Sequence, residues 1–533
     1  MTKELIISTV FLSPLLFTLI AILSWFMRGL RPKILIWVSK ISIYASILVA
    51  IFSALIVYQY GFLESNSIAY NGIGLSIRLD ALSVLIFTMI NLISFIVMRF
   101  SFNYMDGDSR HGVFIGRLAA TIASVQLLVL SGNIGLLWIS WVLTSISLHR
   151  LLVFYSERRR SKLAARKKFI AARLSDLFLL GAVILIFNYF GTGNLEEIIT
   201  GIKGFANNVP FKIELAAICI VLAAILKSAL FPTHAWLVEV METPTPVSAL
   251  LHAGLLNAGP FLVARMSFVV VETTYAPILL IVFGGFTALF GSIAYMTQSS
   301  VKTALGYSSI SHMGFSLLLC GFGIYAAAML HLVAHSFYKA HAFLSSGSLI
   351  DVKKATKISL PARKANPLIL IISIVLAFTI FGIMAYAWGI NPIEELSLLV
   401  ISCIIVMGLS LLIGTAFDSY GSRRLIPRVV LMAALVAFAF FSLETIMAAI
   451  LKSQIPVIMQ PSTVVVILLF FWLIVFTGLV LIQIFSPFIR NSTVWRKWSI
   501  HFRNGLYANV LYDRLVGALY VKASKPNFIK KHE

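Results

Sequence analysis

The amino-acid sequence predicts an all-α polytopic membrane protein with about fifteen transmembrane helices, some of them broken. Of its 533 residues, 60% are hydrophobic and only 12% are charged. Soluble domains carry about twice that charged fraction and rarely contain apolar runs of about 20 residues. Lysine and arginine are also spread very unevenly between the two sides of the predicted spans. These three observations together predict the fold class.

Fifteen stretches are long and apolar enough to cross a bilayer, for which about 20 residues suffice. They cover residues 5–27, 34–60, 79–100, 113–131, 134–155, 168–190, 212–231, 247–270, 276–298, 304–323, 326–349, 366–389, 396–417, 428–451 and 462–487. The first stretch lacks a basic leader and a small-residue cleavage site, so we expect a retained helix rather than a signal peptide. All three cysteines fall within apolar spans, which favours neither disulfides nor a metal cluster.

The net charge of +22 orients the chain in the membrane rather than indicating nucleic-acid binding. With the N-terminus outside, 33 of the 42 lysines and arginines lie on the inner side and 6 on the outer side. The remaining three, Arg150, Lys227 and Lys339, lie within spans. Because inner loops are enriched in basic residues, this asymmetry predicts an outside N-terminus and an inside C-terminus.

The most basic inner segment is residues 157–173, between spans 5 and 6. The simpler interpretation is a solvated topological anchor that also attracts anionic lipid. The alternative is a docking surface for a cytoplasmic partner. Span 6 then opens with Arg173 and Asp176, whose i,i+3 spacing lets them neutralise each other on one helix face.

Residues 227–265 contain a charged amine beside a helix break, and the rest of the chain is organised around them. Lys227 lies near the end of span 7. Pro232 is expected to stop that helix, because proline lacks a backbone N–H and clashes with the preceding turn. A charge at membrane depth is costly, and such groups usually mark an ion or substrate pathway. Broken helices survive there where they line a cavity or pack on protein.

A short polar segment with Glu239 and Glu242 follows the break. Pro244 and Pro246 then open span 8, which carries His252 about two turns inside. The sequence therefore predicts a second titratable group close to the first.

Spans 10 and 11 add further titratable groups. Span 10 carries His312 among several serines, a density that often serves helix packing alone. In span 11, His331, His335 and Lys339 are spaced i, i+4, i+8 and so project from nearly one face, whereas His341 points elsewhere.

Lysines and histidines on facing helices are suited to stepwise proton movement, because histidine titrates near neutrality and burial makes a lysine easier to deprotonate. For any single histidine, a satisfied hydrogen-bonding role is an equal alternative. A histidine-pair metal site is disfavoured, since no cysteine or acid is suitably placed and Lys339 adds like charge. We expect no catalysis, metal or cofactor in this chain. The predicted ion pathway comprises Lys227, His252, His331, His335, Lys339, Asp176, His312 and Glu242, with His149, Arg150 and Glu444 as weaker candidates.

Spans 12–15 contain almost no ionisable residue, and the chain ends in a basic tail. In this tail Trp495, Trp498, Phe502 and Leu506 form one stripe, which predicts an amphipathic helix on the inner leaflet or against a partner. We therefore divide the chain into N-terminal helices (1–112), an ion-translocating core (113–350), C-terminal helices (351–489) and a cytoplasmic tail (490–533).

The central motifs resemble the antiporter-like membrane subunits of respiratory complex I and the Mrp sodium/proton antiporters. The resemblance runs from span 3 to span 11 and includes Arg173-x-x-Asp176 and His331-x3-His335-x3-Lys339. Its central part reads Lys227, Pro232, His234-Ala-Trp236 and Met241-Glu-x-Pro244-Thr-Pro246-Val-Ser-Ala-Leu-x-His252. The resemblance implies that Lys227 is the central lysine, His252 the span-8 histidine, and His331, His335 and Lys339 the span-11 set.

Three departures distinguish this chain from that superfamily. Val142 follows Trp141 where the family carries a glutamate that partners the central lysine. Span 12 lacks the family's charged residue, and the long lateral helix of the largest complex I subunit is missing. Asp176 is our candidate to replace the missing glutamate, with His149 as the weaker one.

These departures, with the segments SISLHRLLVFY, ARKKFIAARLSD and HAGLLNAGPF and the tail NGLYANVLYDRLVG, are most similar to the DabB family. Its members are membrane subunits of bacterial inorganic-carbon accumulation (DAB) complexes. The resemblance implies a bacterial inner-membrane location and a cytoplasmic DabA-like zinc partner related to β-carbonic anhydrases. It also implies that H+ or Na+ flow drives CO2 hydration to bicarbonate, with zinc in the partner. The alternatives are a subunit of a complex I-like dehydrogenase or Mrp-type antiporter, and a passive membrane anchor.

Overall fold

The computed structural model describes residues 7–65, 68–155, 157, 159–205, 209–240, 243–347, 367–391, 394–417, 425–458, 460–484 and 492–520. In these ranges, ten helices are long and apolar enough to cross a membrane. A helix also overlaps each of the fifteen predicted spans. The chain is therefore a polytopic helical membrane protein, whereas the count of fifteen crossings and the orientation stay predictions.

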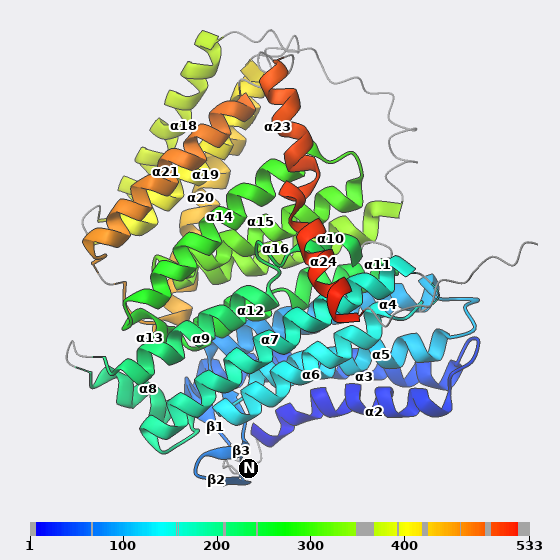
Figure 1. The fold of residues 1–533 in the computed structure, drawn as a ribbon. Coiled ribbons are helices and arrows are strands. Elements are labelled where there is room, and N and C mark those ends of the chain that lie inside the picture. The colour runs from blue at the N-terminus through cyan, green and yellow to red at the C-terminus, as the bar shows by residue number, and fades with distance from the viewer. Residues whose placement is uncertain are drawn as a thin grey trace, which may run out of the picture.

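The first six long helices run side by side in Figure 1 and pack on one another through buried aliphatic and aromatic side chains. After a short turn η1 (Thr9–Phe11), they are α2 (Leu12–Phe26), α3 (Lys33–Tyr60), α4 (Ala81–Tyr104), α5 (His111–Leu130), α6 (Ile134–Leu152) and α7 (Arg159–Phe190).

The all-α class is confirmed, and two small sheets that the sequence did not predict lie between α3 and α4. Strand β1 (Leu63–Glu64) pairs with β4 (Arg78–Leu79), and β2 (Ile68–Tyr70) pairs with β3 (Ile73–Leu75), both antiparallel. The β2–β3 turn holds Asn71 and Gly72 at positive φ, as a tight hairpin requires. An Asn-Gly pair between alternating apolar residues is a hairpin signal that the span-based interpretation passed over.

Arg78 and Asp80, at the start of span 3, belong to a buried polar network. Asp80 caps α4 by accepting from the Ser83 N–H at 2.8 Å, and it accepts from Arg78 at 2.7 Å. Arg265, from the far end of span 8, also donates to Asp80. The network joins the start of α4 to the central helices.

The middle of the chain is broken into short helices. After α8 (Leu195–Lys203), which was not predicted, the run comprises α9 (Phe211–Lys227), α10 (Ala235–Glu239), α11 (Thr245–Leu250), the π-helix η3 (Leu251–Leu255), α12 (Ala258–Arg265) and α13 (Ser267–Val271). Predicted spans 7 and 8 are thus interrupted helices.

Continuous helices follow: α14 (Tyr275–Thr297), α15 (Val301–Gly321), α16 (Tyr325–Leu344) with the turn η4 (Ser345–Gly347), α18 (Pro367–Ala387), α19 (Leu396–Phe417), α20 (Leu425–Leu451) and α21 (Thr463–Ile484). One core cluster of buried residues runs from Ile7 to Leu479, and a second, smaller cluster lies within α18–α20.

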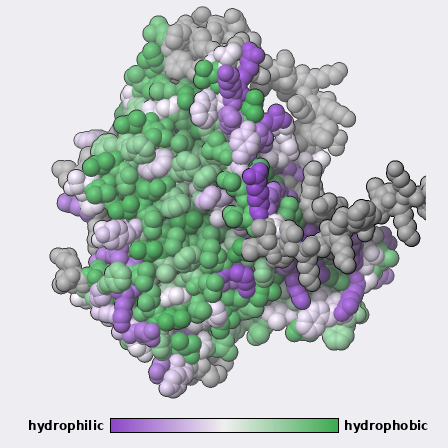
Figure 2. All heavy atoms as spheres, in the orientation of Figure 1, coloured by the Kyte–Doolittle hydropathy of each residue, from purple (hydrophilic) through white to green (hydrophobic). Residues whose placement is uncertain are grey.

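The tail forms two helices across the ends of the bundle (Figure 1). They are α23 (Thr493–Arg503) and α24 (Ala508–Tyr520), joined by the turn η5 (Gly505–Tyr507). Leu506 has a φ of 51°, so it lies beyond the predicted amphipathic helix rather than on its stripe. Figure 2 shows hydrophilic residues gathered along α23, beside a broad hydrophobic surface over the long helices.

Candidate functional site

The break after span 7 lies at Lys227 itself. Helix α9 ends at this residue, four positions before Phe231, where the sequence predicted the end. Ala229 has a φ of 55°, a left-handed conformation that prevents the helix from continuing to Pro232. The Phe231–Pro232 peptide bond is cis. The break therefore places the Lys227 side chain at a helix terminus inside the bundle.

Lys227 is surrounded by neutral acceptors. Its Nζ donates to the Trp141 carbonyl and the Thr144 hydroxyl, both at 2.8 Å, and to the Ser145 hydroxyl at 2.6 Å. The ammonium also lies 4.4 Å from the centre of the Trp141 ring. These groups of α6 accept hydrogen bonds from all three N–H groups of the Lys227 ammonium. They take the place of the glutamate that the similar antiporter-like subunits carry in this helix.

Asp176 does not pair directly with Lys227. Its carboxylate lies 2.6 Å from the Arg173 guanidinium, which confirms the predicted i,i+3 pair. The hydroxyls of α6 lie nearer to the Lys227 amine, so the Asp176 carboxylate influences it electrostatically rather than through a direct hydrogen bond. His149, the weaker candidate, packs its ring against Phe169.

Two lysines of α7 lie beside this site, although sequence reasoning placed them in a solvated loop. Helix α7 begins at Arg159, so Lys167 and Lys168 are helical and buried. Lys168 donates to the Ser145 carbonyl at 2.6 Å, on the residue whose hydroxyl binds Lys227. The interpretation of residues 157–173 as fully solvated was wrong for these two lysines.

Lys167 forms an ion-pair cluster at the end of the bundle. Its Nζ lies 2.6 Å from the Glu239 carboxylate, and it also pairs with Asp513 of α24. Burial raises the pKa of Glu239, and the Lys167 ammonium opposes that rise. The cluster fixes the tail beside the broken helices.

Small polar contacts join the first break to the second. Ser228, directly after Lys227, donates to the Leu256 carbonyl at 3.1 Å. A Cβ on Gly259 would overlap the Ser228 side chain, so α12 approaches α9 closely only because this position is glycine. Asn257 donates to Ser336 of α16 at 2.7 Å and so links span 8 to span 11.

His252 lies inside the π-helix η3, a distortion that often marks functional sites. Its ring is fully buried and stacks on Phe343, with ring centres 4.3 Å apart. Neither ring nitrogen has a hydrogen-bond partner among the described residues. Such a group carries a desolvation cost that packing alone does not explain.

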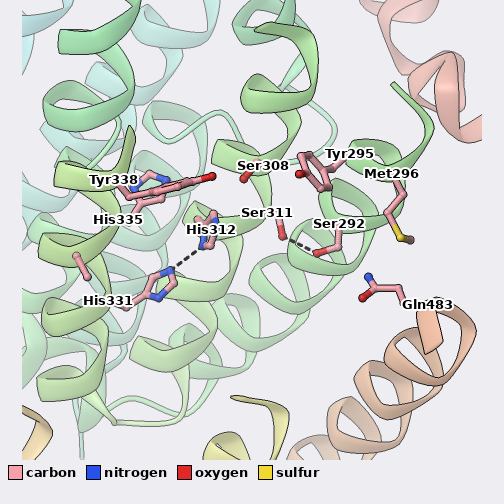
Figure 3. Close-up of a pocket in the computed structure, with 11 residues that line it drawn as sticks. Ser292, Tyr295, Met296, Ser308, Ser311, His312, His331, His335, Tyr338 and Gln483 are labelled. Atoms are coloured by element: carbon pink, nitrogen blue, oxygen red, sulfur yellow. Dashed lines mark hydrogen bonds between the residues drawn. The ribbon is translucent and has the colours of Figure 1, made fainter. Parts of the chain in front are cut away.

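Three histidines meet between α15 and α16, as Figure 3 shows. His312 Nδ1 lies 3.1 Å from His331 Nε2, and the ring centres of His312 and His335 are 4.9 Å apart. They line a cavity of about 750 Å³ that α14 and α21 complete with Ser292, Tyr295 and Gln483. Lys339 is fully buried one turn further along α16 and donates to the Leu305 carbonyl at 3.0 Å.

The predicted residues thus fall into two centres, one around Lys227 and one around the span-11 histidines, with His252 on an element between them. His341 is exposed, as its register predicts. Glu242 lies outside the described residues. Within the part of the chain that the structure describes, no three His, Cys, Asp or Glu side chains could hold a metal.

Sequence reasoning missed Thr144, Ser145, Asn257 and Ser336, because a hydroxyl or amide in an apolar span carries no signal of its distant partner.

Comparison with known proteins assigns the family. A family model described as "NADH:quinone oxidoreductase/Mrp antiporter, TM" matches residues 131–417, more than half of the chain. The chain belongs to this family. A second model, for the N-terminus of complex I chain 5, matches residues 67–115 of this antiporter-family chain.

Curated relatives fall into two groups. One is a "probable inorganic carbon transporter subunit DabB2" of Halothiobacillus neapolitanus, 41% identical over 286 residues, which are 54% of this chain and 52% of that protein. Another is NADH-quinone oxidoreductase subunit L of Escherichia coli, 32% identical over 279 residues, 52% of this chain and 46% of that protein. The chain spans about half the length of the curated relatives it matches.

A solved structure supports the fold of this antiporter-family chain over nearly its whole length. The Mrp complex from Dietzia contains a chain that matches with a TM-score of 0.64 and 21% identity, covering 98% of this chain and 61% of that one. The antiporter-like fold therefore extends beyond the residues that the family models match.

Proposed function

We propose that this chain is the ion-translocating membrane subunit of an inorganic-carbon accumulation complex in a bacterial inner membrane. Downhill H+ or Na+ flow through it would drive hydration of CO2 by a cytoplasmic, DabA-like zinc partner related to β-carbonic anhydrases.

One observation carries the proposal: amines and imidazoles are buried within the apolar helices without carboxylate partners. Lys227 and Lys339 donate only to neutral oxygens among the described residues, and the His252 and His335 rings have no hydrogen-bond partner there. Such groups are costly at membrane depth and are retained where charge moves. Histidine and desolvated lysine can each exchange a proton at modest cost.

The chemistry is assigned to a partner because this chain supplies no suitable metal-ligand set in its described ranges. The relatives named as inorganic carbon transporter subunits favour carbon accumulation over other coupled reactions. Loss of the family's glutamate beside Lys227 is consistent with a changed coupling scheme.

Substitution of the buried groups tests the proposal. Lys227→Ala and His335→Ala should each reduce inorganic-carbon uptake to background while the complex still assembles, measured as co-purification with a zinc-containing protein. Lys212→Ala is the matched control, because Lys212 is an exposed lysine in the first turn of the same helix. Full uptake by both test variants would remove the relay assignment.

A subunit of a complex I-like dehydrogenase or Mrp-type antiporter is the second candidate, favoured by 32% identity to subunit L of Escherichia coli. Co-purification with other antiporter-like membrane subunits would support it instead. A passive anchor is distinguished by an uncoupler: carbon uptake that survives collapse of the ion gradients would favour the anchor.

A further inference from the structure

A second cavity, remote from the histidines, is built from arginines. It has a volume of about 560 Å³ and lies where α2, α5 and α6 meet, at the end that the charge asymmetry predicts to face inward. Four guanidinium groups line it: Arg28, Arg110, Arg117 and Arg150. Such a convergence of like charges is unfavourable unless an anion joins it.

Backbone carbonyls and one aromatic ring hold these arginines in place without neutralising them. Arg117 donates to the Arg150 carbonyl at 2.7 Å, and Arg28 donates to the Trp25 carbonyl at 2.9 Å. The guanidiniums of Arg110 and Arg117 both lie over the Phe154 ring, at 5.1 and 5.6 Å from its centre.

Carboxylates neutralise little of the positive charge in this cavity. Glu157 lies 3.4 Å from Arg110, but its side chain is 70% exposed. Asp108 accepts from the Arg110 backbone N–H and from Tyr155. Arg28, Arg117 and Arg150 have no carboxylate within 4.0 Å in the described ranges. The cavity therefore carries a surplus of positive charge.

Apart from Ser24 and Ser147, the remaining lining side chains are apolar. Trp25 and Ile146 line the cavity and are exposed. On α6, exposed Ile139, Leu143 and Ile146 share the helix stripe that ends at Arg150, since they are spaced by three or four residues. An anion bound here would have hydrocarbon directly beside it, which favours an amphiphile over a freely soluble ion.

We propose that this arginine cavity binds the phosphate headgroup of an anionic phospholipid, with the acyl chains along the α6 stripe and beside the exposed Trp25 of α2. Arginine forks match phosphate oxygens in pairs, and basic pockets between transmembrane helices on the inner side suit such headgroups. Close contact of α2 with α5 shapes the floor, because a Cβ on Gly116 would overlap Ser24.

Arg150→Gln is the most informative variant. The Arg150 side chain donates no hydrogen bond within the described residues, while its backbone carbonyl still holds Arg117, so folding should be unaffected. Arg99→Gln is the matched control. It removes the same charge from an exposed position outside the cavity, near the end of α4 that is predicted to face inward.

Quenching of Trp25 fluorescence reports occupancy directly, because this indole lines the cavity. The Trp25 contribution is the difference between the fluorescence of the wild type and that of Trp25→Phe. With the full-length protein, brominated phosphatidylglycerol should quench Trp25 at a lower lipid fraction than brominated phosphatidylcholine. Arg150→Gln should weaken this preference about tenfold, as loss of a charge-assisted hydrogen bond does. Arg99→Gln should leave it unchanged.

Two outcomes would overturn the proposal. Equal quenching by both lipids, or equal weakening by Arg99→Gln, would mean that the arginines act only as general inner-side charge. Displacement of phosphatidylglycerol by millimolar inorganic phosphate would mean that the cavity takes a free anion. The experiment needs no carbon-uptake assay, so its result is independent of the proposed transport function.

Discussion

The acceptors of Lys227 replace a carboxylate with hydroxyls, and this changes what the amine can do. A carboxylate would hold the lysine charged, whereas Thr144, Ser145 and the Trp141 carbonyl can bind either the ammonium or, through their own hydroxyls, the neutral amine. The site is therefore suited to a lysine that loses and regains its proton.

Ser145→Ala tests this arrangement. It removes the shortest hydrogen bond to Lys227 and leaves the Ser145 carbonyl for Lys168. We expect partial loss of uptake and about 1 kcal/mol of stability, since hydrogen bonds between transmembrane helices average ~0.6 kcal/mol and reach ~1.7. Thermal unfolding in detergent and uptake in cells measure the two effects. Ser147→Ala, on the same helix but lining the arginine cavity, should affect neither.

Outside the membrane, Glu64 gives the hairpin region a pH-dependent stability. Burial raises its pKa from 4.5 to about 7, against the nearby Arg78 charge and the 2.8 Å hydrogen bond that Asn194 donates. The folded state then holds the proton more tightly than the unfolded chain, so stability falls as the pH rises between these values.

Glu64→Gln keeps the acceptor for Asn194 and removes the titration. The wild-type unfolding temperature should therefore fall relative to Glu64→Gln as the pH rises from about 5 to about 8. Glu157→Gln, which changes an exposed acid that does not contribute to the Glu64 pKa, serves as the control. A constant difference between wild type and Glu64→Gln across this range would contradict the assignment.

At this scale, the sequence could predict residues that share one helix but not their distant partners. The i, i+4, i+8 spacing placed His335 and Lys339 on a buried face. It could not reveal that Lys227 binds Ser145, 82 positions away, or that Asp176 stays with Arg173. Partners across helices depend on packing angles that no local pattern specifies.

Among the elements, the tail helix α24 is held to the bundle by a buried cation. Lys167 is fully buried between Glu239 and Asp513, and Tyr512 donates to the Lys167 carbonyl at 2.8 Å. The same α7 turn carries Lys168, which reaches the Lys227 site through Ser145. The position of the tail is thus connected to the Lys227 centre by two adjacent residues.

Lys167→Met should release α24. It leaves the Glu239 and Asp513 carboxylates without their cation, and because their side chains are 25% and 41% exposed, solvent screens part of the loss. Trypsin cleavage at Arg503 and Arg514 should become several-fold faster. Lys162→Met, at an exposed position of the same helix, should leave cleavage unchanged. Unaltered cleavage of Lys167→Met would show that the ion pairs do not hold the tail.

Element boundaries were predictable where hydropathy alone decides them. Helices α3, α14 and α19 begin and end within one residue of the predicted spans. Helix α9 ended early, because the left-handed turn at Ala229 has no sequence signature, alanine being an ordinary helix former. Helix α7 began early, because its first turns contain basic residues that the span criterion assigns to a loop.

Across the whole molecule, the histidine-lined cavity exists because the C-terminal helices close on the central ones. Gln483 of α21 completes the wall opposite His312 and His331 (Figure 3). Helix α21 approaches α14 at Gly285, where the Trp472 indole lies against the glycine backbone. A family model ending at residue 417 does not include this contact, so one wall of the cavity lies outside the matched region.

Gly285→Ala should therefore disturb the cavity from a distance. The added Cβ would overlap the Trp472 indole, and such overpacking costs about 1 to 3 kcal/mol. Gly478→Ala makes the same change within α21, where a Cβ meets open space, so it should stabilise by up to ~1 kcal/mol through helix propensity. Thermal unfolding gives the stabilities, and the rate of histidine modification by diethylpyrocarbonate reports access to the cavity.

The two readouts separate local strain from a change in the cavity wall. If α21 closes the cavity, Gly285→Ala should both lower the unfolding temperature and speed modification of His312 and His331. Gly478→Ala should neither lower the unfolding temperature nor change the modification rate. Loss of stability with unchanged modification would mean that the indole yields without moving α21. The Gly285–Trp472 contact would then not be what holds the α21 wall of the cavity in place.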